Sequence, residues 1–329
     1  MNIMNLKAIQ LGAVVLSLIL CGDIYHFLTF KPATSIQENV QIARGTPVSS
    51  LANNLEEKNY ISNSFYWKIL AVITNKSSKI QAGEYHFADN SNPISILNML
   101  VEGKTVLSSI TFLEGWTFDR AHKALKDKAE VRQTIPASEE FLFSLNGELR
   151  HPEGWCYPDT YKFSRGATDR ELLDLCHQAM VKALNKAWDN RTIFDAYKNK
   201  YEALIMASIV EKETSQKNEK PIVAGVFIRR LAENMKLQTD PTVIYGLGKE
   251  FKGNITKKHL KQDTIYNTYL HKGLPPTPIS MPGIESINAA LNPVITDALY
   301  FVSKGDGTHY FSNTYTEHKQ AVKKFQLKR

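Results

Sequence analysis

The sequence has few cysteines and lacks the short motifs that mark metal, redox or phosphate sites. Three cysteines occur in 329 residues, which is too few for a disulfide framework, and no CxxC pair indicates zinc or redox chemistry. The nine histidines include no HExxH motif. Gly246 and Gly248 follow no strand-to-helix pattern, which argues against a phosphate-binding loop. We therefore expect neither a metal ion nor an organic cofactor.

The charge balance excludes a further class of protein. The chain carries 40 Lys and Arg against 33 Asp and Glu, and this net charge of +7 is spread along the sequence. An arginine-rich arm, zinc-finger spacing and an RNP-like aromatic motif are all missing, so we expect no nucleic-acid partner. The hydrophobic fraction of 43% is high enough for a sizeable core and argues against a disordered chain.

The thiols and hydroxyls lack the surroundings of a catalytic nucleophile. Cys156 and Cys176 are the two cysteines that could pair outside a membrane; the sequence leaves their pairing open, and we expect core thiols. Ser208 has no GxSxG setting. His309 and His318 each stand alone, so we expect surface residues or hydrogen-bonded residues without a role in chemistry.

An apolar run near the N-terminus is long enough to cross a membrane. The run covers residues 9–21 and continues more weakly to Phe30. No small-x-small cleavage site follows it, and Cys21 lacks the preceding small residue of a lipoprotein signal. A signal-sequence core and a buried helix are the alternatives. We expect residues 1–31 to form a cytoplasmic tip and an uncleaved anchor, with Lys7 inside and the remaining chain outside the cytoplasm.

Beyond the anchor, the pattern predicts a linker over residues 32–40 and a small α+β module over residues 41–104. The expected elements of the module are a strand at Gln41, a helix after Pro47, a helix over 65–74, a strand in QAGEYHF and a helix from Pro93 to near Gly103. In the second helix we expect four side chains to face inward, namely Trp67, Ile69, Leu70 and Ile73.

Residues 105–329 predict a larger α+β domain. Its expected helices cover residues 172–188, 201–214, 221–235 and 286–291, and its expected strands cover residues 110–115, 300–304 and 309–312. Residues 237–283 form a long segment rich in Thr, Tyr, Asn, Gly and Pro. Connections of that length are usually functional or disordered, and the recurring tyrosines and threonines favour a functional segment.

Two carboxylates, Glu211 and Glu213, end the almost wholly apolar segment LIMASIVEKETSQ. Burial against apolar walls raises the pKa of a carboxyl by disfavouring its anion, and a general acid at neutral pH needs such a pKa. Residues two apart lie on different faces of a helix, so at most one of the pair enters a given cleft. Alternatively, both are solvated charges at a helix end, partnered by Lys212 or Lys217.

Polar and aromatic side chains concentrate after this helix. Aromatic planes mixed with amides and hydroxyls suit a carbohydrate chain, whose rings have apolar faces and equatorial hydroxyls. A proline-pinned structural loop is the alternative. The candidate residues are Gln238, Thr239, Asp240, Tyr245, Tyr266, Asn267, Thr268 and Tyr269.

Several motifs in order resemble the endolytic murein transglycosylase family (MltG, YceG-like): EGWCYPDTY, ASIVEKET, LQTDPTVIYGLG, YNTYLHKGLPP and MPG. The resemblance covers nearly the whole chain and implies an inner-membrane anchor, a LysM-like module and a periplasmic catalytic domain. The family's catalytic glutamate matches the second glutamate of EKET, which is Glu213, with Glu211 as the fallback. The resemblance also implies six candidates for lining the substrate cleft, namely Gln238, Thr239, Asp240, Tyr266, Asn267 and Tyr269. Glycan strands and peptidoglycan synthases are the implied partners.

The resemblance implies cleavage between N-acetylmuramic acid and N-acetylglucosamine within nascent peptidoglycan. Glu213 would protonate the linking oxygen, and the muramyl C6 hydroxyl would attack C1 to close a 1,6-anhydro ring. A muramidase-type hydrolase that uses Asp240 as a second carboxylate is one alternative. A non-catalytic scaffold that binds peptidoglycan is the other.

Overall fold

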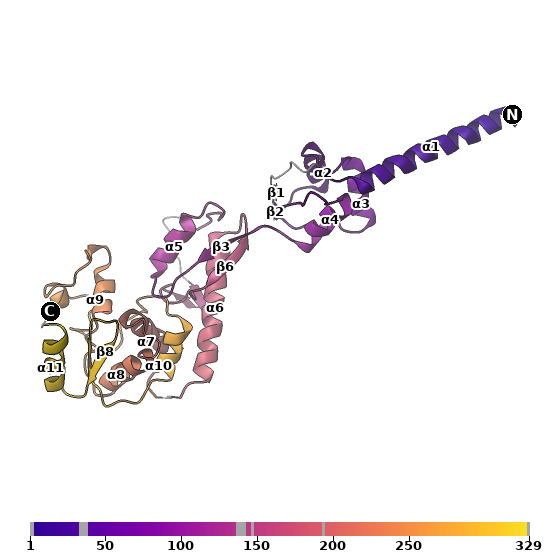
Figure 1. The fold of residues 1–329 in the computed structure, drawn as a ribbon. Coiled ribbons are helices and arrows are strands. Elements are labelled where there is room, and N and C mark those ends of the chain that lie inside the picture. The colour runs from indigo at the N-terminus through magenta and orange to yellow at the C-terminus, as the bar shows by residue number, and fades with distance from the viewer. Residues whose placement is uncertain (1–2, 33–38, 136–142, 146–147, 193–194, 328–329) are drawn as a thin grey trace. The chain divides into compact units, whose positions relative to one another are not determined.

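The computed structural model describes residues 3–32, 39–135, 143–145, 148–192 and 195–327. The chain divides into two compact units, of which the first comprises Met1–Ser108 with Lys162–Gly166 and the second comprises Ser109–Tyr161 with Ala167–Arg329. Most of the expected linker, residues 33–38, lies outside the described residues. Both units combine helices with short two-stranded sheets, which confirms the α+β class (Figure 1).

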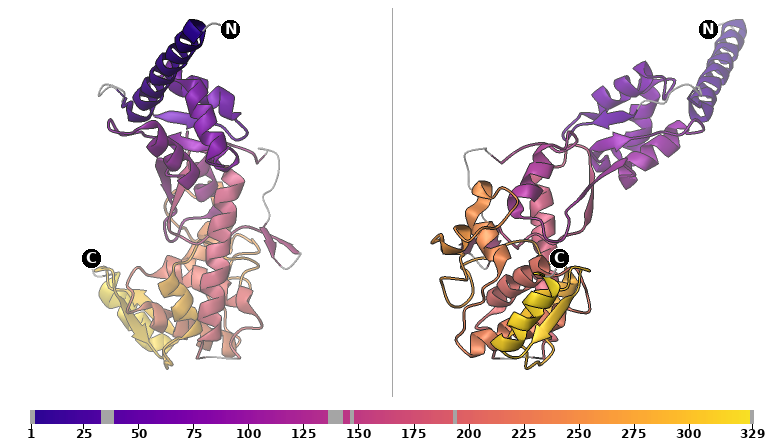
Figure 2. Two further views of the ribbon diagram at one scale, coloured as in Figure 1. Left: turned by 90° about the vertical axis from the view of Figure 1, so that its right-hand side faces the viewer. Right: turned by 60° about the vertical axis from the view of Figure 1, so that its left-hand side comes forward.

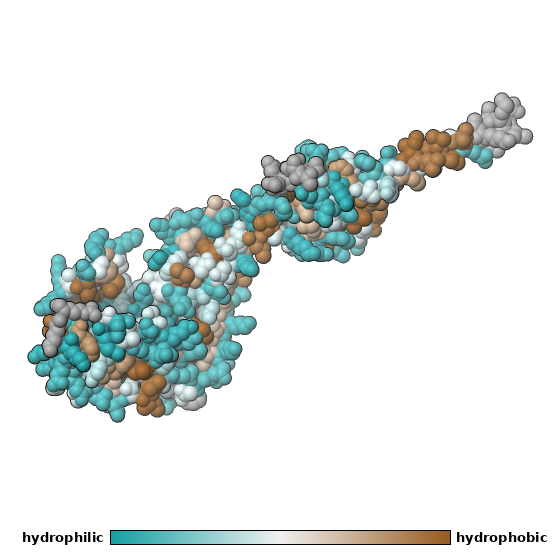
Figure 3. All heavy atoms as spheres, viewed as in Figure 1, coloured by the Kyte–Doolittle hydropathy of each residue, from teal (hydrophilic) through white to brown (hydrophobic). Residues whose placement is uncertain are grey.

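The first unit begins with α1 (Ile3–Thr29), which is 27 residues long. Its part from Gln10 to Thr29 has a mean hydropathy of 1.9 and is long and apolar enough to cross a membrane; signal sequences share these features. Apolar side chains cover this helix in Figure 3. Near its end, Phe27 is buried and packs against Tyr66, with 5.7 Å between the ring centroids.

The rest of the first unit is a small module with two strands and three α-helices. Its elements are β1 (Val40–Ile42), α2 (Val48–Glu57), α3 (Ser64–Ile73), η1 (Ser77–Lys79), β2 (Gly83–Tyr85) and α4 (Pro93–Glu102). The two strands pair antiparallel, with Val40 opposite Tyr85. Asn92 caps α4, and Gly103 ends it in the left-handed conformation with φ of 66°. The expected strands and helices of this region are therefore confirmed.

The inward face of α3 differs from the expectation. Trp67 and Ala71 are fully buried, whereas Ile69 is 42% exposed and Ile73 is 74% exposed. Trp67 and Ala71 lie four residues apart, so they occupy the same side of the helix. The large indole, which donates a hydrogen bond to the carbonyl of Pro93, determines which side packs inward. The expectation that both isoleucines face the core was wrong.

The division between the units falls within β3 (Leu107–Thr111) and β6 (Thr160–Ser164), which pair with each other. The helices of the second unit are α5 (Phe118–Lys126), α6 (Asp169–Asp189), α7 (Lys200–Glu213), α8 (Lys220–Ala232), α9 (Asp240–Leu247), η2 (Gly248–Glu250), η3 (His259–Lys261), α10 (Ile284–Leu291) and α11 (Tyr315–Phe325). Its remaining strands are β4 (Phe143–Leu145), β5 (Glu148–Arg150), β7 (Tyr300–Ser303) and β8 (His309–Ser312).

Helix α7 forms the centre of the second unit. Residues 203–210 of this helix are buried without interruption, and α8 and α10 pack against it. Ser208 joins α7 to a distant segment, because its hydroxyl accepts the backbone N–H of Ile279 at 3.0 Å. The β7–β8 hairpin and α11 pack together, as the yellow elements in Figure 2 show. Glu211 and Glu213 lie in the last turn of this packed helix.

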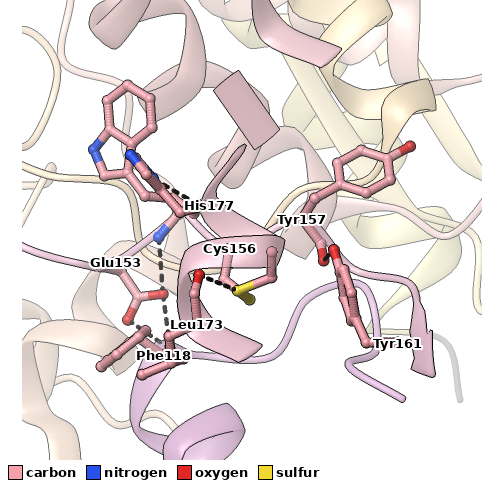
Figure 4. The surroundings of a disulfide bond; sticks show 10 residues. Phe118, Glu153, Cys156, Tyr157, Tyr161, Leu173 and His177 are labelled. Atoms are coloured by element: carbon pink, nitrogen blue, oxygen red, sulfur yellow. Dashed lines mark hydrogen bonds between the residues drawn. A yellow bond between two sulfur atoms is a disulfide. The ribbon is translucent and has the colours of Figure 1, made fainter. Parts of the chain in front are cut away.

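A disulfide joins Cys156 to Cys176 and ties the segment before β6 to α6 (Figure 4). Both cysteines are fully buried, and the backbone N–H of Tyr157 donates to the carbonyl of Cys176 at 2.9 Å. The pairing that the sequence left open is thus present: both cysteines lie in the core as expected, but as a disulfide and not as thiols. The two residues are 20 positions apart, and sequence spacing alone gave no sign that α6 would bring them together.

We expect the disulfide to stabilise the second unit, because closing a loop of this length restricts the unfolded chain. Replacing both cysteines by alanine should lower the free energy of unfolding by about 3 kcal/mol. Urea unfolding with and without reductant measures this loss. Reductant should destabilise the native protein but leave the double variant unchanged; equal sensitivity of both proteins would contradict the assignment.

Candidate functional site

Glu213 is the last residue of α7, and its side chain reaches the wall of a cavity in the second unit. The hydroxyl of Thr239 donates a short hydrogen bond to Glu213 Oε1. Burial, with a smaller contribution from the nearby charge of Asp240, raises the pKa of Glu213 to about 7 against the lowering effect of the Thr239 hydrogen bond. A substantial fraction of this carboxyl is therefore protonated at neutral pH.

A buried group of threonines fixes the hydroxyl of Thr239. The backbone N–H of Thr239 donates to Thr268 Oγ1 at 3.1 Å, and Thr242 Oγ1 donates to the Thr239 carbonyl at 2.8 Å. The hydroxyls of Thr242 and Thr268 are themselves 2.9 Å apart. The loop that precedes α9 is thus held against the segment around residue 268, and Thr239 is presented to Glu213.

Asn267 supports the same segment from within. It is fully buried, and its amide donates to the carbonyls of Leu260 and Gln262 at 3.2 and 2.8 Å. Its Oδ1 accepts the backbone N–H of Tyr269 at 2.9 Å. All of these contacts are made to backbone, so Asn267 shapes the loop and does not line the cavity.

The cavity beside Glu213 has a volume of about 430 Å³. Three of the residues expected from sequence line it with Glu213, namely Gln238, Asp240 and Tyr269. Tyr269 donates its hydroxyl hydrogen bond to Asp240 Oδ1 at 2.6 Å. Residues that the sequence analysis did not select also line it, among them Arg230, Tyr300 and His309. The hairpin β7–β8 therefore completes a wall that the motifs alone did not reveal.

Arg230 holds one edge of this cavity in place. It is 7% exposed, and its guanidinium donates to the carbonyls of Leu237 and Leu299 at 2.8 and 2.6 Å. Gln238 has φ of 52°, a left-handed conformation that is uncommon for a residue with a side chain. Two contacts maintain this turn next to Glu213. Arg230 donates to the carbonyl of Leu237, and the backbone N–H of Gln238 donates to the carbonyl of Thr268 at 3.2 Å.

Tyr245 and Tyr266 lie at a second cavity of about 950 Å³. Their rings meet edge to face with 4.8 Å between centroids. Asp240 at the start of α9 lines the first cavity, and Ile244 and Tyr245 further along α9 line the second. The aromatic candidates from sequence are thus divided between two cavities that share α9 as a wall.

A buried carboxyl, Glu153, forms part of the second cavity. It accepts hydrogen bonds from the backbone N–H of Phe118 at 3.1 Å and from the hydroxyl of Tyr245 at 3.1 Å (Figure 4 shows Glu153 beside Phe118). Burial raises the pKa of Glu153 to about 7, against the lowering effect of these donors. Because its oxygens already accept hydrogen bonds from both α5 and α9, Glu153 joins these two helices.

Glu211 has a different environment from Glu213. Its carboxylate pairs with Lys220 at 3.1 Å, and both side chains are almost fully buried. Oε2 also accepts the backbone N–H of Gly283 at 3.0 Å and the hydroxyl of Ser286 at 2.6 Å. Glu211 therefore connects α7 to α8 and to the start of α10. The alternative of solvated charges partnered by neighbouring lysines is wrong for Glu211.

Among the residues that the structure describes, no group of three or more His, Cys, Asp and Glu side chains could hold a metal ion. The two lysines considered as partners of Glu211 and Glu213 have other contacts. Lys212 donates to the Gly115 carbonyl at 3.2 Å, and Lys217 lies 3.8 Å from Glu285. The first cavity presents the Glu213 carboxyl with tyrosine, amide and guanidinium groups around it.

We expect Glu211→Gln to destabilise the second unit. The substitution removes the charge that compensates Lys220, and an uncompensated buried charge costs about 3–5 kcal/mol. Urea unfolding at neutral pH should show a loss of this size. The matched single variant is Lys220→Met. The double variant Glu211→Gln with Lys220→Met should lose less free energy of unfolding than the two single variants lose together. A double-variant loss equal to that sum would contradict the pairing.

We expect Glu213→Gln to have the opposite effect on stability at high pH. The pKa of Glu213 is about 7 in the folded protein against an ordinary 4.5, so the folded state binds more protons and loses stability as the pH rises between these values. Glutamine removes this cost of about 3 kcal/mol. The variant should unfold at higher urea than the native protein at about pH 8 and match it at about pH 4.5. Equal stability at both values would contradict the raised pKa.

Comparison with known proteins places the chain in one family. The profile of the YceG-like family matches residues 40–324. The chain is 34% identical to the endolytic murein transglycosylase of Bacillus subtilis (strain 168) over 309 residues, which cover 87% of this chain and 84% of the relative.

More distant relatives agree. The chain is 26% identical to the endolytic murein transglycosylase of Streptococcus pneumoniae serotype 2 (strain D39), but it spans only 57% of that protein's length. A crystal structure of a YceG-like protein from Listeria monocytogenes is 32% identical with a TM-score of 0.54, covering 87% of this chain and 99% of its own. The chain belongs to the YceG-like family.

Proposed function

We propose that the protein is an endolytic peptidoglycan lytic transglycosylase. It cleaves the bond between N-acetylmuramic acid and N-acetylglucosamine within nascent glycan strands and leaves 1,6-anhydro ends, which terminates strand elongation. The observation that carries the proposal is Glu213, a carboxyl with a pKa of about 7 at the wall of a polar and aromatic cavity. The relatives named as endolytic murein transglycosylases support it.

In this proposal Glu213 is the general acid. Its proton passes to the oxygen that links the two sugars as the bond from C1 to that oxygen breaks. The muramyl C6 hydroxyl attacks C1, so water is not consumed. The hydroxyl of Thr239 fixes the carboxyl and stabilises the carboxylate that remains after proton transfer.

The glycan occupies the first cavity around the bond that breaks. Gln238, Asp240 and Tyr269 line this cavity and offer amide, carboxylate and aromatic contacts to the sugar rings. Tyr245 and Tyr266 provide aromatic surface in the second cavity, across α9, for sugars further along the strand. Thr239 and Asn267 act through the position of the loop that carries them.

A muramidase-type hydrolase is the second candidate, favoured by one observation. Asp240 lines the same cavity as Glu213, and its charge raises the pKa of Glu213. A hydrolase of this type would use Asp240 as the second carboxylate, as a nucleophile or as a base toward water. The hydrogen bond from Tyr269 to Asp240 competes with that role, because it occupies Oδ1.

We further propose that α1 is a single membrane span in the inner membrane and that the chain after it lies on the periplasmic side. The buried disulfide between Cys156 and Cys176 supports this placement, because such bonds persist in oxidising compartments and are rare in the cytosol. The membrane keeps the enzyme where nascent strands are made, and the synthases that make them are its proposed partners.

Residues 41–104 are proposed to be a LysM-like module. The order β1, α2, α3 and β2, with the two strands paired antiparallel, supports this assignment. The module would hold a glycan strand near the membrane while the second unit cuts it. A non-catalytic scaffold would need the module alone, whereas the protonated carboxyl of Glu213 serves an enzyme.

We expect Glu213→Gln to lower kcat by about 10²–10⁴-fold, because glutamine cannot donate the required proton. The full-length protein in detergent is incubated with nascent, uncrosslinked glycan and with intact sacculi, and the released glycans are analysed by mass spectrometry. Anhydro products are lighter by one water than hydrolytic ones. The kcat of the native enzyme should also fall as the pH rises above about 7, where Glu213 loses its proton.

The products distinguish the candidates. Water-added ends that disappear in Asp240→Asn would establish the hydrolase in place of the transglycosylase. Glycan binding without any cleavage of either substrate would favour the scaffold. Full activity of Glu213→Gln alongside loss of activity in a folded Glu211→Gln would assign the acid to Glu211.

A further inference from the structure

His309 forms a close pair with Glu219. Its Nδ1 lies 2.7 Å from Glu219 Oε2, and its backbone N–H donates to Glu219 Oε1 at 2.9 Å. Glu219 immediately precedes α8, and His309 opens β8, so the pair joins two elements far apart in the sequence. The two side chains are only 11% and 14% exposed. This two-point contact fixes the imidazole in one orientation.

The orientation determines which ring nitrogen is available. A ring that donates Nδ1–H to a carboxylate carries its acceptor lone pair on Nε2 in the neutral form. Among the residues that the structure describes, the hydrogen bond of the His309 ring is made through Nδ1 and none is made through Nε2. The ring packs edge-on against Phe301, with 5.4 Å between centroids. In the tautomer that donates from Nδ1, Nε2 of His309 is therefore a free acceptor.

His309 and Glu213 line the same cavity of about 430 Å³. The two groups are close enough for a positive charge on His309 to lower the pKa of Glu213. A sugar bound in this cavity would therefore lie against walls that carry both Glu213 and His309. The contacts with Glu219 agree with the expectation of a hydrogen-bonded residue, whereas the place of His309 at the cavity was not expected from sequence.

We propose that His309 is the general base of the reaction and that Glu219 is its positioning residue. This inference rests on the proposed transglycosylase function and divides its two proton transfers between two residues. Glu213 donates to the leaving oxygen, and Nε2 of His309 accepts the proton of the muramyl C6 hydroxyl. Glu219 holds the ring through Nδ1 and stabilises the imidazolium that forms, as a carboxylate does in other Glu–His or Asp–His pairs.

The step balances without another reactant. The proton of Glu213 moves to the glycosidic oxygen, and the electron pair of the C1–O bond goes with that oxygen. A lone pair of O6 forms the O6–C1 bond, and the O6 proton moves to Nε2. The site is left with a carboxylate on Glu213 and an imidazolium on His309, and one proton transfer between them through solvent restores the starting state.

A second histidine–carboxylate pair in the same unit shows why location matters. His271 lies 2.7 Å from Asp263, a distance equal to that of the His309 pair, but the two side chains are 51% and 77% exposed. This pair borders neither of the cavities described above. It therefore supplies a matched control for removing a histidine that is paired with a carboxylate.

The experiment compares kcat and KM of full-length variants on uncrosslinked glycan, with anhydro products counted by mass spectrometry. His309→Asn is the informative variant, because its amide can still donate to Glu219 but offers no basic nitrogen. We expect kcat to fall by about 100-fold or more with KM within about threefold of the native value. Glu219→Gln should lower kcat to an intermediate value, and His271→Asn should leave both constants unchanged.

Chemical rescue separates a base from a structural role. Imidazole added to His309→Ala should restore part of kcat, and a series of substituted imidazoles should give rates that rise with their pKa. Native-like kcat in His309→Asn would overturn the proposal, because a merely structural ring would be replaced by the amide. Failure of every imidazole to restore activity in a folded His309→Ala protein would also overturn it.

The experiment distinguishes failure of the His309 inference from failure of the proposed transglycosylase function. If the native protein forms anhydro ends, Glu213→Gln abolishes them and His309→Asn retains them, the transglycosylase stands and the role of His309 falls. If the native protein forms no anhydro ends, the proposed function itself fails. Equal melting temperatures of His309→Asn and the native protein, measured by circular dichroism, ensure that a lost rate reflects chemistry.

Discussion

The rest of the candidate site depends on the burial of one carboxyl at the end of α7. Residues 203–210 give this helix an unbroken buried surface, so its C-terminal end is fixed within the second unit. Burial makes the Glu213 anion unfavourable, and the hydroxyl of Thr239 offsets only part of that cost. The threonine group, the turn at Gln238 and the contacts of Arg230 all hold the loop that delivers this hydroxyl.

The two carboxylates at the end of α7 show how position alone separates structural from chemical roles. Glu211 meets a lysine, a backbone N–H and a serine hydroxyl, so its charge is compensated and its geometry is fixed. Glu213, two residues later, meets one hydroxyl and a cavity. Glu211 thus connects α7 to its neighbouring helices, whereas Glu213 is the proton donor of the proposed reaction.

The sequence predicted the strongly apolar helices well, but it did not predict a polar helix or the contacts between residues far apart in the chain. The starts of α7 and α8 lie within one residue of the expected positions, because apolar runs and a proline mark them. Helix α11 was missed because most of its residues are polar and Ala321 is the residue that it buries. Lys220, Gly283 and Ser286 could not be assigned to Glu211 from sequence, because folding alone brings these distant residues together. The same holds for His309 and Glu219, which are 90 positions apart.

Helix α1 contributes to the fold of the first unit as well as carrying an apolar surface. Phe27 is 3% exposed and belongs to the hydrophobic core that contains Trp67, Tyr85 and Leu100. Burying such a side chain contributes about 1.5–3 kcal/mol. A shortened protein that begins after residue 31 would therefore lose part of the core of its first unit and expose the ring of Tyr66. Removing the apolar helix would therefore increase solubility but destabilise the first unit. A shortened protein that begins before Phe27 would keep this core side chain.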